Sequence, residues 1–578
     1  MATTKGTEYS LTLKTGDRDR PMLLEEDVFI RFYNKKQVKS HHIKIAIDEL
    51  EIGQTKDFKF VIEDQKFGDP LYIELQRENK WLRHGRWLCD YVKLAKVNSD
   101  EVFMFPVNRC VWAGSTLKLK EYDTSLPQED ANSEQRRTEL KKKEIFYDTY
   151  KSEKTGMIMV RHIPYGEAFS FRYKWDIETE VFKLIAKSAW LEWSTGKCET
   201  LEDIEKLYRP PLLPVPEGFY HWKSDQHFAN QRLTGCNPAM IRLCTQIPEN
   251  FAVDAKQLES LLNGSTIDKV INEKRLFIVN HELVKDLPCK EGVLCAPIAL
   301  FFVNGEDNLM PIAIQLFQHP APTNPVFYPT DPEYTWMMAK CYFNLADASI
   351  HEASSHLGFT HLIGEIVVIA TNRCLSPSHP IFRLLAPHFL YLLAINKIGM
   401  GPLLGAHGLL SDIMTCGSTG LSEIIKRKIV GDYELQEWAA FLASQGNDDT
   451  VGEGANGIEA KGGIKGLPND GHFKTAKEIS EVVTSFIFIF SATHASVNFG
   501  QYDNYAFPPA YPGWMNGQPP QDKTALTEKD LIAKLPNKKK ILKTMSFTKL
   551  LSMHDTCALG DFEVQYLFDP VSLGALDK

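Results

Sequence analysis

The sequence predicts a two-part fold, an antiparallel β-sandwich followed by a large and mainly α-helical domain. From Tyr9 to Tyr122 the chain carries short runs of alternating apolar residues, separated by polar or glycine-containing turns, and this is the pattern of half-buried strands. Beyond that region the apolar pattern becomes long and helical. A chain of 578 residues also exceeds one ordinary hydrophobic core, so at least two domains are expected. We place them at residues 1–122 and 123–578.

The individual elements follow from the same periodicities. The clearest strand patterns are at residues 28–32, 58–62, 71–75 and 91–94. Residues 128–143 are dense in charge and nearly devoid of apolar side chains, which indicates a linker or the exposed start of a helix. The strongest helical patterns are at residues 336–363 and 479–497, and the glycine-rich residues 452–471 indicate a flexible loop.

Composition favours a globular protein of a reducing compartment. The chain is 43% hydrophobic and 24% charged, and its net charge of −9 is spread along the sequence, which leaves no basic footprint for nucleic acid. Eleven cysteines without paired spacing predict reduced thiols and a cytoplasmic location. The polar N-terminus does not resemble a secretory signal. The longest apolar runs, at 389–395 and 486–490, are shorter than a bilayer span, so we expect a soluble chain.

Two histidine-bearing segments indicate a mononuclear metal site. His351 and His356 lie in the first segment, and His494 and Asn498 lie in the second. Imidazole nitrogens together with a neutral oxygen donor suit a borderline metal such as iron better than magnesium or calcium, which prefer oxygen ligands. A single histidine is more often a hydrogen-bonded core or surface residue, but a cluster is harder to explain in that way.

Helix geometry constrains which of these residues can share a metal. At about 100° per residue, His494 and Asn498 lie roughly 40° apart on one face of an ordinary helix. His351 and His356 lie about 140° apart on such a helix, so their joint ligation requires a wider turn such as a π-bulge. His356 and His361 repeat the same spacing. The arithmetic therefore leaves the choice between the two pairs open.

Several long segments closely resemble the animal lipoxygenase family. They are residues 228–238, 295–300, 310–316, 334–340, 351–362, 379–388, 394–396 and 491–503. Carried over by position, the resemblance implies that His351, His356, His494 and Asn498 are iron ligands and that His361 matches a nearby histidine that is not a ligand. It also implies a non-haem iron dioxygenase that abstracts hydrogen between two cis double bonds of a polyunsaturated fatty acid, such as arachidonate. Dioxygen is then added, and the product is a fatty-acid hydroperoxide.

The expected sandwich is similar to the PLAT domain that precedes the catalytic domain in animal lipoxygenases. Asp48, Glu49 and Glu51 fall in the loop that supplies calcium ligands in several relatives, and clustered carboxylates suit calcium. A solvated acidic loop is the alternative. Trp81 lies between charged neighbours and suits a membrane interface, or else packing against the catalytic domain. Together these features imply a calcium-dependent, reversible association with a membrane surface.

One glycine carries an expectation about product stereochemistry. Gly399 matches the family position at which glycine is associated with R products and alanine with S products, because a missing methyl group leaves space for oxygen at one end of the pentadiene. The alternative is that Gly399 only relieves backbone strain, since Gly401 and Gly405 lie nearby.

Two departures from the family pattern bear on activity. Relatives have a long helical segment between the positions of Ile429 and Tyr433, which are nearly adjacent here, and they end in an isoleucine whose carboxylate completes the iron shell, whereas this sequence ends at Lys578. We therefore expect a less stable and slower enzyme. The alternative is a catalytically impaired relative that binds lipid in a calcium-dependent manner and regulates a partner.

Overall fold

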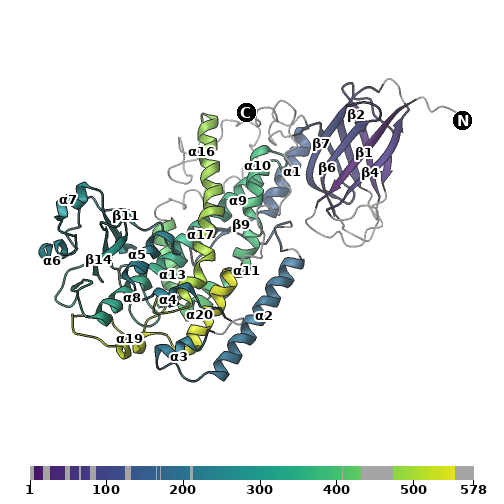
Figure 1. Ribbon diagram of the computed structural model, residues 1–578. Helices are drawn as coiled ribbons and strands as arrows, with labels where there is room; N and C mark the ends of the chain where they lie inside the picture. The colour runs from purple at the N-terminus through teal and green to yellow at the C-terminus, as the bar shows by residue number, and fades with distance from the viewer. Residues whose placement is uncertain are drawn as a thin grey trace.

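The computed structural model confirms the expected fold class, a β-sandwich followed by a mainly helical body (Figure 1). The two parts lie side by side, and the sandwich is at the N-terminal end of the molecule. The structure describes residues 6–16, 27–45, 53–63, 67–77, 86–123, 132–164, 166–169, 171–208, 213–405, 408–430 and 473–553.

The sandwich consists of two four-stranded antiparallel sheets with strand orders β4-β1-β6-β7 and β3-β2-β5-β8. The strands are β1 (Thr7–Thr15), β2 (Val28–Asn34), β3 (Ile43–Ile45), β4 (Thr55–Ile62), β5 (Pro70–Arg77), β6 (Arg86–Lys96), β7 (Val102–Trp112) and β8 (Thr116–Lys120). Burial alternates along β1 and β2, so each sheet directs one face inward. Leu11, Phe32, Trp87 and Phe105 are fully buried between the sheets.

A five-stranded antiparallel sheet lies inside the helical body, where the sequence indicated only helices. Its order is β11-β12-β13-β14-β15. The strands are β11 (Arg242–Leu243), β12 (Leu276–Asn280), β13 (Ile298–Val303), β14 (Leu309–Gln315) and β15 (Val326–Phe327). The central strands β13 and β14 are buried along almost their whole length. Strands that are covered on both faces lack the alternation that identifies a strand in a sequence.

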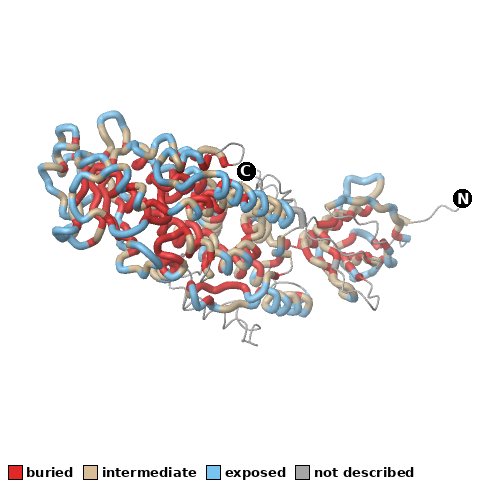
Figure 2. The backbone as a smooth tube through the Cα atoms, turned by 90° about the horizontal axis from the view of Figure 1, so that it is seen from below, coloured by how far each residue is buried: buried red, intermediate tan, exposed pale blue. Residues whose placement is uncertain are grey.

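One long composite helix crosses the centre of the body. It consists of α8 (Glu333–Ile350), the π-helix η4 (His351–Leu362) and α9 (Ile363–Cys374). Its residues are buried almost throughout, and they belong to the continuous buried region in the middle of the body (Figure 2). A helix that is apolar on all sides belongs in the interior of a large domain.

A second composite helix crosses the first one near its middle. It consists of α16 (Ala476–Ile487), the π-helix η8 (Phe488–Thr493) and α17 (His494–Phe499). Thr475 and Glu478 form a reciprocal capping box at its start, which satisfies backbone N–H groups that would otherwise lack partners. Contacts join η4 to both η8 and α17, so the two π-helices of the histidine segments meet in space.

Helix α1 (Ser133–Phe146) is anchored by a buried ion cluster that the charge-dense sequence did not indicate. Arg136 is fully buried and pairs with Asp123 and Glu139. Arg109 of β7 also pairs with Glu139 and donates a hydrogen bond to Ser376, which follows α9. The cluster therefore ties the sandwich to the helical body. Buried charges tolerate desolvation only when they are paired in this way.

Helix α13 (Gly417–Ile425) contacts η4 directly, and five further helices belong to the same body. They are α2 (Phe171–Ser194), α5 (Asp225–Thr234), α11 (Leu392–Leu404), α18 (Gln501–Tyr505) and α20 (Lys538–Leu551).

Three helical stretches are long and apolar enough to cross a membrane by length and composition, contrary to the estimate from uninterrupted apolar runs. They are Glu333–Cys374, Pro380–Leu404 and Ala476–Tyr505. The stretches are longer than the uninterrupted apolar runs because the helices continue through polar residues that interrupt a run. The most apolar window of the first stretch is 78% buried inside the protein.

Candidate metal centre

The π-helix η4 presents three histidines at intervals of five residues. His351, His356 and His361 all lie within its bounds. The wider turn that joint ligation at this spacing requires is therefore present. The ring centroids of His351 and His356 are 5.8 Å apart with nearly parallel planes, and those of His356 and His361 are 5.0 Å apart. Such bulges concentrate at functional sites.

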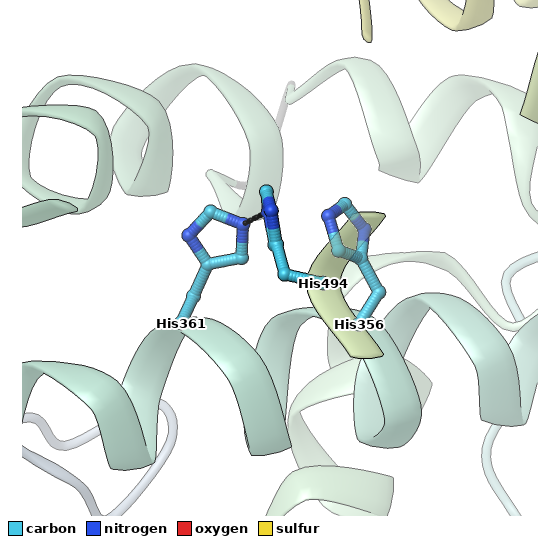
Figure 3. A group of neighbouring side chains, drawn as sticks. All are labelled: His356, His361 and His494. Carbon is cyan, nitrogen blue, oxygen red and sulfur yellow. Dashed lines mark hydrogen bonds between the residues drawn. The ribbon is translucent and has the colours of Figure 1, made fainter. Parts of the chain in front are cut away.

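His494 completes a compact group of three imidazoles with His356 and His361 (Figure 3). One ring nitrogen from each of these residues lies within 4.8 Å of the others. His494 comes from α17, and its ring lies between the two rings that rise from η4. The Nε2 atoms of His494 and His361 are 3.0 Å apart, so one of them donates its proton to the other.

Burial keeps the three imidazoles neutral. It lowers the pKa of His356, His361 and His494 to about 3 in each case, and a neighbouring imidazole adds repulsion in all three. Neutral imidazole is the form that binds a metal. Nε2 of His356 is buried and makes no hydrogen bond within the described part of the chain. A buried nitrogen without a hydrogen-bond partner is suited to bind a metal ion.

A hydrogen-bonded chain fixes the orientation of His361. Its Nδ1 lies 3.0 Å from Oδ1 of Asn396 on α11, and since that oxygen only accepts, Nδ1 must carry the proton. Asn396 in turn donates 2.7 Å to Glu365 and 3.0 Å to the backbone carbonyl of His361. Burial raises the pKa of Glu365 to about 7. These interactions leave a lone pair on Nε2 of His361, directed at His494.

His351, which the resemblance implies as an iron ligand, makes hydrogen bonds with both ring nitrogens. Its Nδ1 lies 2.8 Å from the hydroxyl of Tyr505, and its Nε2 lies 2.8 Å from the carbonyl of Val497. Both ring nitrogens therefore face protein groups, and His351 lies outside the three-histidine group. The expected ligand pair at the π-helix is His351 and His356, whereas the geometry brings together His356 and His361.

Asn498 lies one turn after His494 on α17, as the four-residue spacing predicts. It is buried, its side-chain N–H donates 2.8 Å to the carbonyl of Leu551, and its Oδ1 accepts from Gln501 at 3.3 Å. The donated bond fixes which end of the amide is the oxygen. That oxygen is the atom available to a metal.

A buried ionic network holds the helix that leads into the site. Asp347, one turn before His351, lies 3.3 Å from Arg232 on α5 and accepts hydrogen bonds from Asn237 and Tyr511. Burial opposes ionisation of Asp347, but the charge of Arg232 and the contact with His281 hold its pKa well below the usual range. This role could not be predicted from the sequence, because a single aspartate within an apolar helix does not identify its partners.

The donor set fits iron. Several neutral imidazoles and an amide oxygen suit a borderline divalent ion rather than magnesium or calcium. The hydrogen bonds that orient His361 and Asn498 are of the kind that positions metal ligands. Ligands on crossed, buried helices are also rigidly held.

Comparison with known proteins decides the family. The sequence profile described as Lipoxygenase matches residues 165–425 and 426–560, which is more than half of the chain. The chain belongs to the lipoxygenase family. The match is interrupted next to η6 (Lys426–Val430), close to the position where the resemblance implies an absent segment.

The curated relatives include coral and mammalian enzymes. An allene oxide synthase-lipoxygenase protein of Plexaura homomalla is 26% identical over 99% of this chain and 61% of its own length, so this lipoxygenase spans about three fifths of that relative. The human polyunsaturated fatty acid lipoxygenase ALOX15B is 29% identical over 78% of this chain and 75% of its own length. The 12R-type arachidonate 12-lipoxygenase of mouse is 26% identical over 82% of this chain and 81% of its own length.

Solved structures match the whole architecture. A lipoxygenase deletion variant in complex with arachidonate has a TM-score of 0.81 at 26% identity, with 99% of this chain and 94% of that chain covered. Coral 8R-lipoxygenase, described with calcium activation through a C2-like domain and a structural basis of product chirality, has a TM-score of 0.80 at 25% identity and the same coverage. These matches agree with the two-part fold of this lipoxygenase.

The remaining predicted site residues fall in different parts of the chain. Asp48, Glu49, Glu51 and Trp81 lie outside the described residues, as does the C-terminal Lys578. Gly399 lies in α11, three residues after Asn396, and it is not among the glycines with positive φ. A Cβ atom added there meets Leu403 at an ordinary 3.5 Å. Neither strain nor a close contact therefore requires glycine at this position.

A large cleft lies away from the histidines. It has a volume of about 1010 Å³ between the sandwich and the helical body, and Arg109, Lys143, Phe146 and Phe382 are among the residues that line it. None of the four histidines lines it. The cleft is therefore separate from the candidate metal centre.

Proposed function

We propose that this lipoxygenase is a non-haem iron dioxygenase that converts polyunsaturated fatty acids of the arachidonate type into hydroperoxides. The observation that carries the proposal is the buried group of neutral imidazoles on two crossed helices, with Nε2 of His356 lacking a partner within the described residues. Membership of the family supplies the reaction class.

The proposed iron ligands are His351, His356, His494 and Asn498, as the resemblance implies. His356 and His494 also belong to the geometric group. His361 is the competing third imidazole, because its Nε2 faces His494 while Asn396 holds its other nitrogen. His351 and His361 therefore form a natural pair of variants for deciding between the two sets.

Bound iron would supply one-electron chemistry that no side chain of the group can provide. The contribution of the protein is to keep the imidazoles unprotonated, to hold them on rigid elements and to exclude water from the site. Burial of His356 and Asn498, at 6% and 8% exposure, serves this last purpose. Apolar helices around the centre suit the hydrocarbon chain of a fatty acid.

The proposed product has R stereochemistry. Gly399 lies on α11, three residues after Asn396, and Asn396 contacts His361 and Glu365. The position that lacks a methyl group is therefore close in sequence to a residue of the site. The coral relative described with a basis of product chirality is an 8R enzyme, which supports this assignment.

We further propose that calcium binds at Asp48, Glu49 and Glu51 and promotes reversible association of a cytoplasmic protein with membrane surfaces, with Trp81 at the interface. The coral relative described with calcium activation through a C2-like domain supports this part of the proposal.

Oxygen uptake by the iron-loaded chain on arachidonate, with chiral chromatography of the product, tests the proposed function. We expect uptake and a conjugated hydroperoxide, and we expect neither after His494→Ala. An iron-loaded protein that consumes no oxygen with any polyunsaturated fatty acid, yet binds vesicles in the presence of calcium, would favour the alternative of a lipid-binding regulatory protein.

A further inference from the structure

The cleft between the sandwich and the helical body is large enough to hold a whole small molecule. Its volume is about 1010 Å³, and ligand pockets in proteins commonly measure about 300–1,000 Å³. Strands β6, β7 and β8 supply most of one wall, and α1, α10 (Pro380–Leu385) and the 3-10 helix η5 (Ala386–Phe389) supply most of the other. Figure 1 shows α1 at the junction of the two parts.

Lys143 of α1 lines this cleft and makes no hydrogen bond or salt bridge through its side chain within the described part of the chain. Its Nζ lies 5.7 Å from the ring centroid of Tyr147 and 5.7 Å from that of Phe382, so two aromatic rings flank the ammonium group. Burial lowers the pKa of Lys143, although the carboxylates of Glu139 and Glu167 oppose that shift. A desolvated cation of this kind gains most from an anion that enters the cleft.

The two carboxylates that act on this lysine have other partners. Glu139 lies 3.1 Å from Nε of Arg109 and 2.9 Å from a guanidinium nitrogen of Arg136. Glu167 accepts a hydrogen bond of 3.0 Å from the hydroxyl of Tyr147. The buried ion cluster is therefore complete without the lysine, and the three N–H donors of the ammonium group remain available to a ligand.

Apolar side chains extend along both walls of the cleft. Phe382 and Phe389 line the helical wall, and Leu117 lines the wall formed by the sandwich. Phe146 of α1 and Trp112 of β7 stack across the two parts with their ring centroids 6.2 Å apart, and Phe146 is still 41% exposed. A hydrocarbon chain in the cleft would remove these side chains from water, which is the main favourable contribution to association.

The balance of charge in the cleft selects a ligand with a single negative charge. Among the described residues that line it, six are basic and five are acidic, a difference of one positive charge. Phosphate groups are bound by several donors that converge, such as paired arginine forks or a helix N-terminus. A nucleotide or another polyanion would instead meet the acidic side chains, among them Glu134 and Glu167.

We propose that this cleft is a second lipid site, which binds one long-chain monocarboxylate such as palmitate. The carboxylate accepts hydrogen bonds from Nζ of Lys143, and the hydrocarbon chain lies against Phe146 and Phe382. A hydrogen bond between two charged groups is roughly twice as strong as one between neutral groups. The site needs neither iron nor double bonds in the chain, so it does not depend on the proposed oxygenation.

Protection of Lys143 from acetylation tests the proposal on the full chain. Limiting acetic anhydride labels the lysines, and peptide mass spectrometry measures the rate at each one. We expect palmitate at ten times its dissociation constant to slow the labelling of Lys143 about tenfold, because only about a tenth of the sites then remains free. Lys141 is the internal control, because it is exposed on α1 and does not line the cleft. Its labelling should not change.

Related probes separate the contribution of the charge from that of the chain. Methyl palmitate lacks the negative charge and acetate lacks the chain, so each should protect Lys143 far less than palmitate. Arachidonate should protect as well as palmitate. Equal labelling with and without palmitate overturns the proposal, and so does protection by methyl palmitate that equals protection by palmitate. Protection by inorganic phosphate without protection by palmitate assigns the cation to a phosphate group and also overturns it.

Equilibrium dialysis of radiolabelled palmitate against variants of the full chain gives a second test. Lys143→Met removes the charge but keeps an unbranched apolar side chain, and the loss of a charge-assisted hydrogen bond should weaken binding in the cleft about tenfold or more. Lys143→Arg should retain binding, because the charge remains. Lys141→Met is the matched control, and circular dichroism verifies that each variant is folded. Palmitate binding that is the same in Lys143→Met as in the parent protein places the ligand in another cavity and overturns the assignment.

The apolar wall is tested with a pair of phenylalanines of nearly equal exposure. Phe146 lines the cleft and is 41% exposed, whereas Phe473 is 40% exposed and does not line it. Phe146→Ser should weaken palmitate binding several-fold, because part of the hydrocarbon chain then loses its apolar contact. Phe473→Ser should leave binding unchanged. An equal loss of binding in both variants, or in neither, contradicts a chain that lies along α1.

Discussion

Asp347→Asn should destabilise the protein strongly, because it removes the charge that pairs with a fully buried Arg232. Both side chains are 0% exposed, and their closest atoms lie 3.3 Å apart. Asparagine preserves the shape but leaves the guanidinium without its counter-ion, and breaking a buried ion pair on one side costs about 3–5 kcal/mol. That is a large share of the roughly 5–15 kcal/mol that stabilises a domain.

Denaturant unfolding of Asp347→Asn, followed by fluorescence and circular dichroism, measures this cost. Asp268→Asn, at an exposed position in the first turn of α7 (Ile267–Asn272), is the control, and it should lower stability by no more than about 1 kcal/mol, because it removes only a charge that favours the helix N-terminus. Since Asp347 precedes His351 by one turn, the variant should also retain less iron. If the free energy of unfolding of Asp347→Asn is within about 1 kcal/mol of that of the parent protein, the ionic network does not support the site as described.

Three further predictions concern chemistry, pH and membranes. Gly399→Ala should shift products from R towards S without loss of folding, because the new methyl group finds an ordinary contact with Leu403; an unchanged ratio in chiral chromatography would limit Gly399 to a passive role. Burial raises the pKa of Glu365 to about 7, so stability should fall as pH rises from about 4.5 to 7, where the unfolded chain alone loses the proton. Glu365→Gln should lack this decline of about 3 kcal/mol in pH-dependent unfolding, and identical pH profiles would contradict the assignment. Vesicle sedimentation should depend on calcium and weaken in Trp81→Ala; equal binding in chelator, unchanged by the substitution, would exclude calcium-dependent docking.

The architecture was largely predictable because its two periodicities differ clearly. Alternation along residues 28–32 corresponds to strand β2, and the apolar pattern from Trp336 continues into the composite helix. The five-stranded sheet was missed, since β13 is buried on both faces and does not alternate. The burial of Arg136 was missed as well, because charge density along a sequence does not show which charge finds two carboxylates in space.

The site was predictable in composition but not in full geometry. The five-residue spacing predicted the wider turn at His351 and His356, and the four-residue spacing placed Asn498 beside His494 on one helix. The spacing could not choose between His351 and His361, because both positions recur at the same interval. The two histidines are distinguished by contacts with residues that are distant in the sequence. The hydroxyl of Tyr505 faces His351, and Asn396 faces His361.

Iron content after purification in the presence of iron tests the central claim most directly. We predict close to one iron per chain for the parent protein, almost none for His356→Ala and His494→Ala, and a strong loss for His351→Ala with retention in His361→Ala. If His361→Ala loses iron and His351→Ala retains it, the third iron ligand is His361, which the structure groups with His356 and His494. Full iron content in a protein that lacks both His356 and His494 would contradict the metal centre itself.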